Sequence, residues 1–472
     1  MAVRIVIIGG GPAGYEAALV AAAHATDVTV IDSDGIGGAC VLFDCVPSKT
    51  FIASTGVRTD LRRAPPLGYD INIEDAKISL PQIHDRVKTL AASQSADIAE
   101  QLRRNGVRLI NGRGELVDPV PGMAKHSVKA TEPDGAEEVL DADVVLIATG
   151  ASPRVLPRAR PDGERILTWR QLYDLTDLPD HLVVVGSGVT GAEFVNAYTE
   201  LGVTVTVVAS RDQILPHEDS EAAAVLEDVF AERGVTLVKN ARADSVTRTG
   251  QGSGAGVTVH MTDGRRVAGS HALITVGSVP NTSGLGLERV GIELGKGDYV
   301  PVDRVSRTSV PTIYAAGDCT GLLPLASVAA MQGRIAMYHA LGDAVTPIRL
   351  RTVAAAVFTR PEIAAVGVPQ AQIDDGTVPA RTVMLPLNTN ARAKMSSLEK
   401  GFVKIFCRPA TGVVIGGVVV APVASELILP IALAVQNQVS VENLAHTLSV
   451  YPSLTGSITE AARRLMAHDD LD

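Results

Sequence analysis

The stretch VRIVIIGGGPAG, residues 3–14, decides the fold. Its first half is a β-branched run that predicts a buried strand, and residues 13–24 have the composition of a helix. Small or conformationally special residues make the turn between them: Gly9, Gly11, Pro12, Ala13 and Gly14. The first glycine allows a tight turn, the second lets the backbone approach a pyrophosphate, and the third lets helix and strand pack closely. Because the helix N-terminus then faces the phosphates, the stretch predicts a dinucleotide site.

An acidic residue follows the next predicted strand. That strand covers residues 28–31, and Asp32 stands 23 residues after Gly9. A carboxylate at this position accepts hydrogen bonds from the ribose hydroxyls of a bound dinucleotide. The combination of strand, helix and acid therefore favours dinucleotide binding over a tight turn that binds nothing.

A second unit of the same kind begins 177 residues later, counted from Gly9 to Gly186. Strands over 182–185 and 203–208 flank a predicted helix over 191–201. Its turn carries the same three glycines: Gly186, Gly188 and Gly191. No acid follows the second strand; Ser210 and Arg211 stand there instead, and an arginine at this place accommodates a 2′-phosphate. We expect NADPH to bind better than NADH, unless Arg211 is only a solvated surface charge.

Composition limits the classes of protein that this chain can be. The 472 residues include 42 Lys and Arg against 52 Asp and Glu, a net charge of −10, and only 3% are aromatic. These values argue against a nucleic-acid binder, which needs a basic face and rings for base stacking. Hydrophobic residues at 46% exclude disorder as the main state. The sequence shows neither an unbroken apolar run long enough for a membrane span nor a secretory signal, so we expect a cytoplasmic protein.

The order of the predicted elements indicates an α/β protein. Short β-branched runs alternate with helical patterns, which is typical of parallel sheets, and a long helix is predicted over 80–104. Past Pro347 the pattern changes to that of a separate α+β unit. Its predicted strands are 354–359, 402–406 and 413–419, and its predicted helices are 424–436 and 441–448.

Two of the four cysteines, Cys40 and Cys45, lie five residues apart. A helical turn could bring the two sulfur atoms together, and a close pair in a cytosolic protein is more often redox-active or metal-binding than structural. No metal site is expected, because the chain has no second cysteine pair and no HxxxH or HExxH motif. The spacing alone leaves a redox pair and two unpaired buried thiols equally open.

Taken together, these motifs resemble the flavoprotein disulfide reductases, the class I pyridine nucleotide-disulfide oxidoreductases. The resemblance covers essentially the whole chain. It rests on the two glycine turns and on five further segments: GGACVLFDCVPSK (37–49), ATG (148–150), VPNT (279–282), TIYAAGD (312–318) and FTRPEI (358–363). The segment GFVKI (401–405) also matches the interface domain of that family.

The resemblance implies two Rossmann-like dinucleotide-binding domains and a C-terminal α+β dimerisation domain. FAD would bind residues 1–150 and 281–345, NAD(P)H would bind 151–280, and residues 346–472 would form a homodimer. Lys49 and Glu193 would form an ion pair beside the flavin ring and count as catalytic with the cysteines. Further cofactor contacts are assigned to the matching motifs: Thr149, Gly150, Gly277, Gly317 and Asp318.

The sequence departs from this family in the parts that serve disulfide chemistry. The family places His-Pro-Thr-x-x-Glu near the C-terminus, and this chain has Tyr451 for the histidine and Gly456 for the glutamate. An unperturbed tyrosine has a pKa near 10, so Tyr451 is a poor acid–base group for dithiol exchange at ordinary pH. Between the cysteines, Leu42, Phe43 and Asp44 replace the usual Asn-x-Gly. A carboxylate beside a thiol raises the pKa of that thiol and disfavours the thiolate.

The motifs that bind the flavin and the nicotinamide are therefore complete, whereas residues that serve disulfide chemistry are replaced. We interpret the chain as an NAD(P)H:quinone oxidoreductase, a diaphorase of the quinone reductase branch, because quinones accept electrons from reduced flavin without a thiol relay. The alternatives are a dihydrolipoamide dehydrogenase or related reductase using Cys40 and Cys45, an FAD-bearing redox sensor, and a soluble transhydrogenase.

Overall fold

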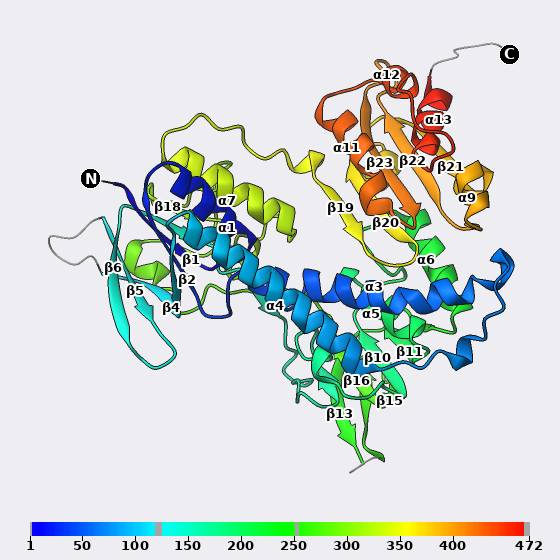
Figure 1. The fold of residues 1–472 in the computed structure, drawn as a ribbon, viewed down its shortest axis with the longest axis horizontal. Coiled ribbons are helices and arrows are strands. Elements are labelled where there is room, and N and C mark those ends of the chain that lie inside the picture. Colours follow the sequence, from blue (N-terminus) through cyan, green and yellow to red (C-terminus); the bar gives the residue numbers. More distant parts are fainter. Residues whose placement is uncertain (1, 119–124, 251–253, 467–472) are drawn as a thin grey trace.

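The computed structural model describes residues 2–118, 125–250 and 254–466, and Figure 1 shows its arrangement around three five-stranded sheets. The first sheet is parallel, in the order β18-β7-β1-β2-β3. Its strands are β1 (Arg4–Ile8), β2 (Asp27–Asp32), β3 (Arg108–Asn111), β7 (Val144–Ile147) and β18 (Ile313–Ala315). The central strands β1 and β7 are buried along almost their whole length, which explains why their sequences are nearly continuous apolar runs.

Helices from distant parts of the chain cover this sheet. They are α1 (Pro12–Ala23), α4 (Leu80–Arg104) and α7 (Ala326–Ala340), whereas α2 (Gly38–Leu42) and α3 (Cys45–Arg62) pack against α4. In Figure 1, α1 and α7 lie next to each other, and a Cβ atom on Gly333 of α7 would meet the carbonyl oxygen of Ala13 at 2.1 Å. Only glycine permits this approach, which brings the α7 segment to the first glycine turn.

The second sheet repeats the parallel pattern, in the order β12-β11-β10-β16-β9. Its strands are β9 (Ile166–Leu167), β10 (His181–Val185), β11 (Thr204–Val208), β12 (Thr236–Val238) and β16 (His271–Ile274), with helices α5 (Val189–Glu200) and α6 (Ser220–Glu232). Small antiparallel sheets adjoin the two parallel ones. They are β4 (Arg113–Val117), β5 (His126–Thr131) and β6 (Glu137–Ala142); β13 (Ala243–Thr249), β14 (Gly256–Met261) and β15 (Arg266–Gly269); and β8 (Ala151–Pro153) with β17 (Ser278–Pro280).

The third sheet is antiparallel, in the order β19-β20-β23-β22-β21. Its strands are β19 (Ala354–Val357), β20 (Glu362–Gly367), β21 (Arg381–Pro386), β22 (Phe402–Cys407) and β23 (Val414–Ala421). Its helices are α8 (Gln370–Asp374), α9 (Ala391–Met395), α10 (Ala424–Leu427), α11 (Leu429–Gln436), α12 (Val441–Ala445) and α13 (Gly456–Leu465). Two parallel Rossmann-like sheets and one α+β unit confirm the predicted fold class.

The helix predicted over 424–436 is two helices, α10 and α11, which meet at Ile428. Pro430 lies in the first turn of α11, where its missing N–H removes no helical hydrogen bond. The helix predicted over 441–448 ends at Ala445. Within the described ranges, none of the helices combines the length and apolarity that crossing a bilayer requires.

One face of α5 contacts α3 and the segment between β19 and β20 through Glu193, Asn196 and Glu200, which follow helical spacing. Glu200 is fully buried and accepts hydrogen bonds from the hydroxyls of Thr55 and Thr59 on α3, both at 2.9 Å. The Arg360 backbone N–H, just ahead of β20, donates to Asn196 Oδ1 at 3.0 Å. This polar seam fixes α3, which carries Cys45 and Lys49, against α5.

Candidate active site

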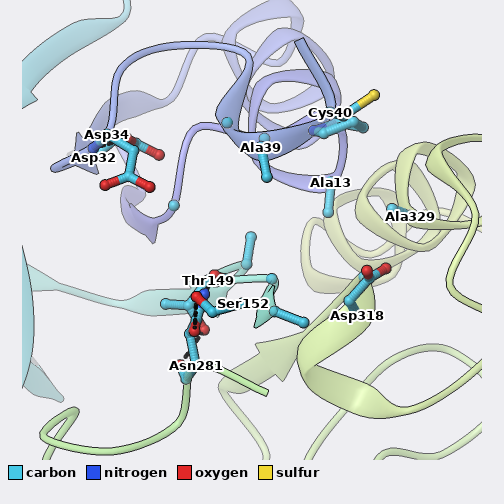
Figure 2. A pocket seen from close by; sticks show the side chains of 18 of the residues that line it. Ala13, Asp32, Asp34, Ala39, Cys40, Thr149, Ser152, Asn281, Asp318 and Ala329 are labelled. Atoms are coloured by element: carbon cyan, nitrogen blue, oxygen red, sulfur yellow. Dashed lines mark hydrogen bonds between the residues drawn. The ribbon is translucent and has the colours of Figure 1, made fainter. Parts of the chain in front are cut away.

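A cavity of about 540 Å³ lies at the carboxyl ends of the first sheet's strands, where open parallel sheets bind ligands. Figure 2 shows it between Asp32 on one side, Cys40 and Asp318 on the other, and Thr149 with Asn281 below. Residues far apart in the sequence therefore meet around one space. They include every residue of the first unit that the sequence assigned to cofactor binding except Gly14 and Lys49, which do not line it.

The first glycine turn has the geometry that its sequence predicts. Gly9 has φ +111°, in the region that favours glycine, and a Cβ atom there would meet Ala148 O at 2.2 Å. A Cβ on Gly14 would meet Gly9 O at 1.9 Å, so helix and strand are in close contact. Gly11 lines the cavity, and among the described residues outside its own chain neighbours only Gly38 Cα lies within 4 Å of a Cβ placed there, at 4.0 Å. The backbone is thus bare where a phosphate would approach it.

Asp32 closes the turn by accepting backbone hydrogen bonds. Gly10 N donates to Oδ2 at 2.5 Å, and the N–H groups of Asp34 and Gly35 donate to Oδ1 at 2.7 Å. Burial raises the pKa of Asp32, while these bonds lower it and leave a net increase. The side chain stays in the cavity wall, where it could receive ribose hydroxyls.

The second glycine turn has nearly the same backbone φ and ψ angles as the first. Gly186 has φ +113°, and Gly188 caps α5 with φ −74° and ψ −173°, against −71° and −173° for Gly11 at α1. A Cβ on Gly191 would meet Gly186 O at 2.3 Å, and none of the described atoms lies within 4 Å of a Cβ on Gly188. The second unit thus presents the same bare helix N-terminus.

The residues that would select between the two nicotinamide cofactors lie at the end of β11. Ser210 and Arg211 follow the strand and are exposed. Gly277 lies just ahead of β17 with φ +95°, and a Cβ there would have open space around it. The structure therefore leaves a guanidinium and a hydroxyl accessible where the first unit has its acid.

Two loops complete the first cavity. Thr149 Oγ1 donates to Asn281 O at 2.7 Å and Asn281 Nδ2 donates back to Thr149 O at 2.9 Å, which joins the ATG turn to β17. Gly317, next to the 3₁₀ turn η7 (Asp318–Thr320), donates its N–H to Gln332 Oε1 at 2.9 Å. Burial raises the pKa of Asp318, whose carboxyl faces the cavity in Figure 2.

Cys40 in α2 and Cys45 at the start of α3 both line the cavity and are free thiols. The hydrogen bond between them is the largest influence on both, and it lowers the pKa of Cys40 while raising that of Cys45. The charge of Asp44 raises the pKa of each thiol, as the sequence predicts, but at Cys40 the hydrogen bond outweighs it. Among the described residues, no group of three or more His, Cys, Asp or Glu is arranged to hold a metal.

Lys49 and Glu193 meet as the resemblance implied. Lys49 Nζ lies 2.8 Å from Glu193 Oε2, and Glu193 Oε1 accepts the Phe358 N–H at 3.0 Å. The Lys49 ammonium also sits 4.9 Å from the centre of the Phe358 ring. Burial lowers the pKa of Lys49, but the attraction of Glu193 and the neighbouring thiol outweighs it, so that the pKa is raised. A positive charge is thus held beside the cysteine pair.

The sequence analysis did not predict that Trp169 and Arg170 lie over the loop between the two cysteines. Arg170 and Trp169 line the cavity, and the Arg170 guanidinium lies 4.5 Å from the centre of the Phe43 ring. Arg170 Nη2 also pairs with Asp34 Oδ2 at 2.9 Å. The one tryptophan of the chain, adjacent to an arginine, was the available signal.

Tyr451 stands apart from this site. It lies in the loop after α12 with 85% of its surface exposed, and it does not line the cavity of its own chain. Gly456 begins α13, so the sequence around it serves as a helix start. His446 is the C-cap of α12.

Comparison with known proteins places the chain. Residues 3–333 match the model for pyridine nucleotide-disulphide oxidoreductases, and residues 353–462 match the dimerisation domain of that family. The NAD(P)H dehydrogenase (quinone) of Mycobacterium tuberculosis is 76% identical, over 100% of this chain and 96% of that protein. The dihydrolipoyl dehydrogenase of Chlorobaculum tepidum is 31% identical, over 97% and 96%. The crystal structure of LpdA from Mycobacterium tuberculosis superposes with a TM-score of 0.93 at 75% identity, over 98% of this chain and 100% of that one. The chain therefore belongs to the pyridine nucleotide-disulphide oxidoreductase family.

Proposed function

We propose that this protein is an FAD-dependent NAD(P)H:quinone oxidoreductase that works as a homodimer. The observation that carries the proposal is the contrast between two intact dinucleotide turns and a missing acid–base pair at Tyr451 and Gly456. The 76% identical relative named NAD(P)H dehydrogenase (quinone) supports the same activity. The match of residues 353–462 to a dimerisation domain supports the homodimer.

The family uses FAD and NAD(P)H, and the residues present fit both. The bare backbone at Gly11 and the acid at Asp32 suit the pyrophosphate and ribose of FAD, with Thr149, Gly150 and Asp318 along the cavity. FAD bound there supplies a two-electron carrier. The second turn at Gly188, with Arg211 exposed nearby, suits a nicotinamide dinucleotide and favours NADPH.

The side chains around the cavity would prepare it for electron transfer. The Lys49 ammonium, held by Glu193, places a positive charge that favours negative charge on a reduced cofactor ring. The Arg170 guanidinium packs on the Phe43 ring, and together they would close the cavity wall beside the cysteines. These groups bind and polarise the cofactor without needing the cysteine pair to exchange electrons.

The acceptor follows from the missing acid–base pair. Reduction of a disulfide needs a group that protonates the leaving thiolate, and Tyr451 has too high an unperturbed pKa for that role. A quinone leaves no thiolate behind, so its reduction dispenses with the histidine. We therefore assign quinones rather than disulfides as substrates.

The test is steady-state turnover of the purified holoenzyme with NADPH and NADH against menadione, lipoamide, glutathione disulfide and NAD⁺. We expect rapid menadione reduction, faster at low concentrations of NADPH than of NADH, and little turnover with either disulfide. Rapid lipoamide reduction would overturn the assignment. Rapid NAD⁺ reduction by NADPH would make the protein a transhydrogenase instead.

Dihydrolipoamide dehydrogenase activity remains the second candidate because one observation favours it. The two thiols are close enough to hydrogen-bond, which is the arrangement that a redox pair needs. The Cys45→Ser variant separates the two candidates. It should keep menadione reduction if the pair is idle and lose lipoamide reduction if the pair is used.

A further inference from the structure

Asp44 carries a half-buried carboxyl that the proposed chemistry has not yet used. It stands between the two cysteines, where the resemblance expects glycine, and it lines the cavity together with them. It also occupies the N-cap position of α3, yet its side chain caps no backbone N–H. Within the described residues, no hydrogen bond reaches its carboxyl oxygens. Withdrawing a carboxylate partly from water is costly when no hydrogen bond replaces the water, so a structural role does not account for this residue.

Charged and titratable groups surround this carboxyl from five elements. They are Cys40 on α2, Cys45 and Lys49 on α3, Tyr173 on η3 (Leu172–Asp174), Glu193 on α5 and Asp318 on η7. Burial raises the pKa of Asp44 to about 6, with Glu193 and Asp318 adding to the rise and Lys49 opposing it. A carboxyl in this state gives up and regains a proton near neutral pH.

A second polar group in the same shell lacks a partner. The hydroxyl of Tyr173 is buried without a hydrogen bond among the described residues, and its phenol interacts electrostatically with Asp44, Glu193 and Cys45. The pKa of Tyr173 is raised well above its usual value, first by burial and then by these charges, so the phenol keeps its proton. Two unpartnered proton-bearing groups thus lie beside the cysteine pair.

We propose that Asp44 donates the proton that quinone reduction consumes. The inference rests on the proposed function. Overall, NAD(P)H, one proton and a quinone give NAD(P)⁺ and a hydroquinone. The nicotinamide supplies two electrons and one hydrogen as hydride. The Asp44 carboxylic acid supplies the second hydrogen to a quinone oxygen, its O–H bond breaks as the new one forms, and a solvent proton then restores the acid through the cavity.

The test compares an acceptor that needs protons with one that does not. Stopped-flow reoxidation of the NADPH-reduced holoenzyme is followed with menadione and with ferricyanide, which takes one electron and no proton. The variants are Asp44→Asn, which keeps the shape, Asp44→Glu, which keeps the acid, and Asp85→Asn on α4, which removes an exposed carboxylate elsewhere.

We expect Asp44→Asn to slow reoxidation by menadione about 100-fold and to leave ferricyanide unchanged, since general acids contribute about 10²–10⁴ in rate. Asp44→Glu should recover part of the loss, and Asp85→Asn should match the native enzyme. The native menadione rate should fall as pH rises through about 6, because the protonated carboxyl is the donor. The Asp44→Asn rate should not change over that window.

The negative charge of Asp44 also affects the reactivity of the two thiols, and this effect can be measured without turnover. Iodoacetamide alkylation of Cys40 and Cys45 in the NADPH-reduced holoenzyme should be faster in Asp44→Asn, because removing a negative charge favours the thiolate. Equal loss of rate with both acceptors, or no loss with either, would overturn the proton-donor role. A native enzyme that reduces ferricyanide but not menadione would instead refute the proposed quinone reductase function.

Discussion

At the scale of single residues, the Lys49–Glu193 pair is the clearest meeting of distant parts of the chain. Glu193 is buried, whereas the Lys49 side chain keeps 29% of its surface exposed. The carboxylate uses its second oxygen for the Phe358 N–H, so both of its oxygens have partners. A pair satisfied in this way resists the loss of either charge.

We expect Glu193→Gln to lower the free energy of unfolding by about 1–3 kcal/mol, because Lys49 is left without its counter-charge but keeps some solvent. The matched control is Asp174→Asn, which breaks the exposed Lys88–Asp174 pair and should cost under about 1 kcal/mol. Urea denaturation of the native protein, the single variants Glu193→Gln and Lys49→Met, and their double variant measures the coupling. A coupling no larger than that of the exposed pair would contradict the prediction.

The glycine turns could be predicted residue by residue, whereas the surroundings of Asp44 could not. A turn at Gly9 and Gly14 is a local property, since the contacts that forbid a side chain come from the same strand–helix unit and its neighbour strand. The pKa of Asp44 depends on Glu193 and Asp318, which are distant in sequence. Sequence reasoning recognised the unusual carboxylate but could not find its burial.

At the scale of elements, α5 has a greater role than its glycine-rich start suggests. Beyond the pair at Glu193, it presents Asn196 to the segment ahead of β20 and Glu200 to α3. The fully buried Glu200 has both α3 hydroxyls at hydrogen-bond distance and two guanidinium groups, Arg233 and Arg360, at 3.7 Å. The sequence predicted the helix but not this seam, because its partners come from three separate segments.

We expect Glu200→Ala to destabilise the protein by about 3 kcal/mol, because it removes the buried carboxylate that two hydroxyls and two guanidinium groups share. Glu232→Ala on α6 removes an exposed carboxylate paired with Lys400 and should cost under about 1 kcal/mol. Urea denaturation with far-ultraviolet circular dichroism gives both values. Equal small losses of stability in the two variants would show that water replaces the interactions of Glu200.

At the scale of the whole molecule, a buried lysine ties the second sheet to the third. Lys404 on β22 lies 2.6 Å from Asp219 Oδ2, the N-cap of α6, and also pairs with Glu221. The same α+β unit exposes apolar side chains that its own core does not cover: Val423, Leu429, Leu433, Leu448, Val450 and Tyr451. Leu448 is 98% exposed, which is unusual for an isolated chain and supports a covered face in the homodimer.

We expect the double substitution Leu429→Glu and Leu433→Glu to convert the dimer to a monomer, because two buried charges at an apolar interface are costly. Leu67→Glu, at an exposed site of the first unit, is the control and should leave the assembly unchanged. Size-exclusion chromatography with light scattering measures the mass of each. A native protein that elutes as a monomer, or a double variant that stays dimeric, would refute the predicted interface.

The two matching glycine turns have a consequence for how such a protein changes over generations. Each cradle is made of backbone, and in the second unit Ser210 and Arg211 are exposed beyond the strand, so substitutions there leave the shape of the cradle intact. Cofactor choice is therefore open to drift and selection one residue at a time. The loop between the cysteines is similarly separable, so a lineage can discard disulfide chemistry while the two cradles remain in place.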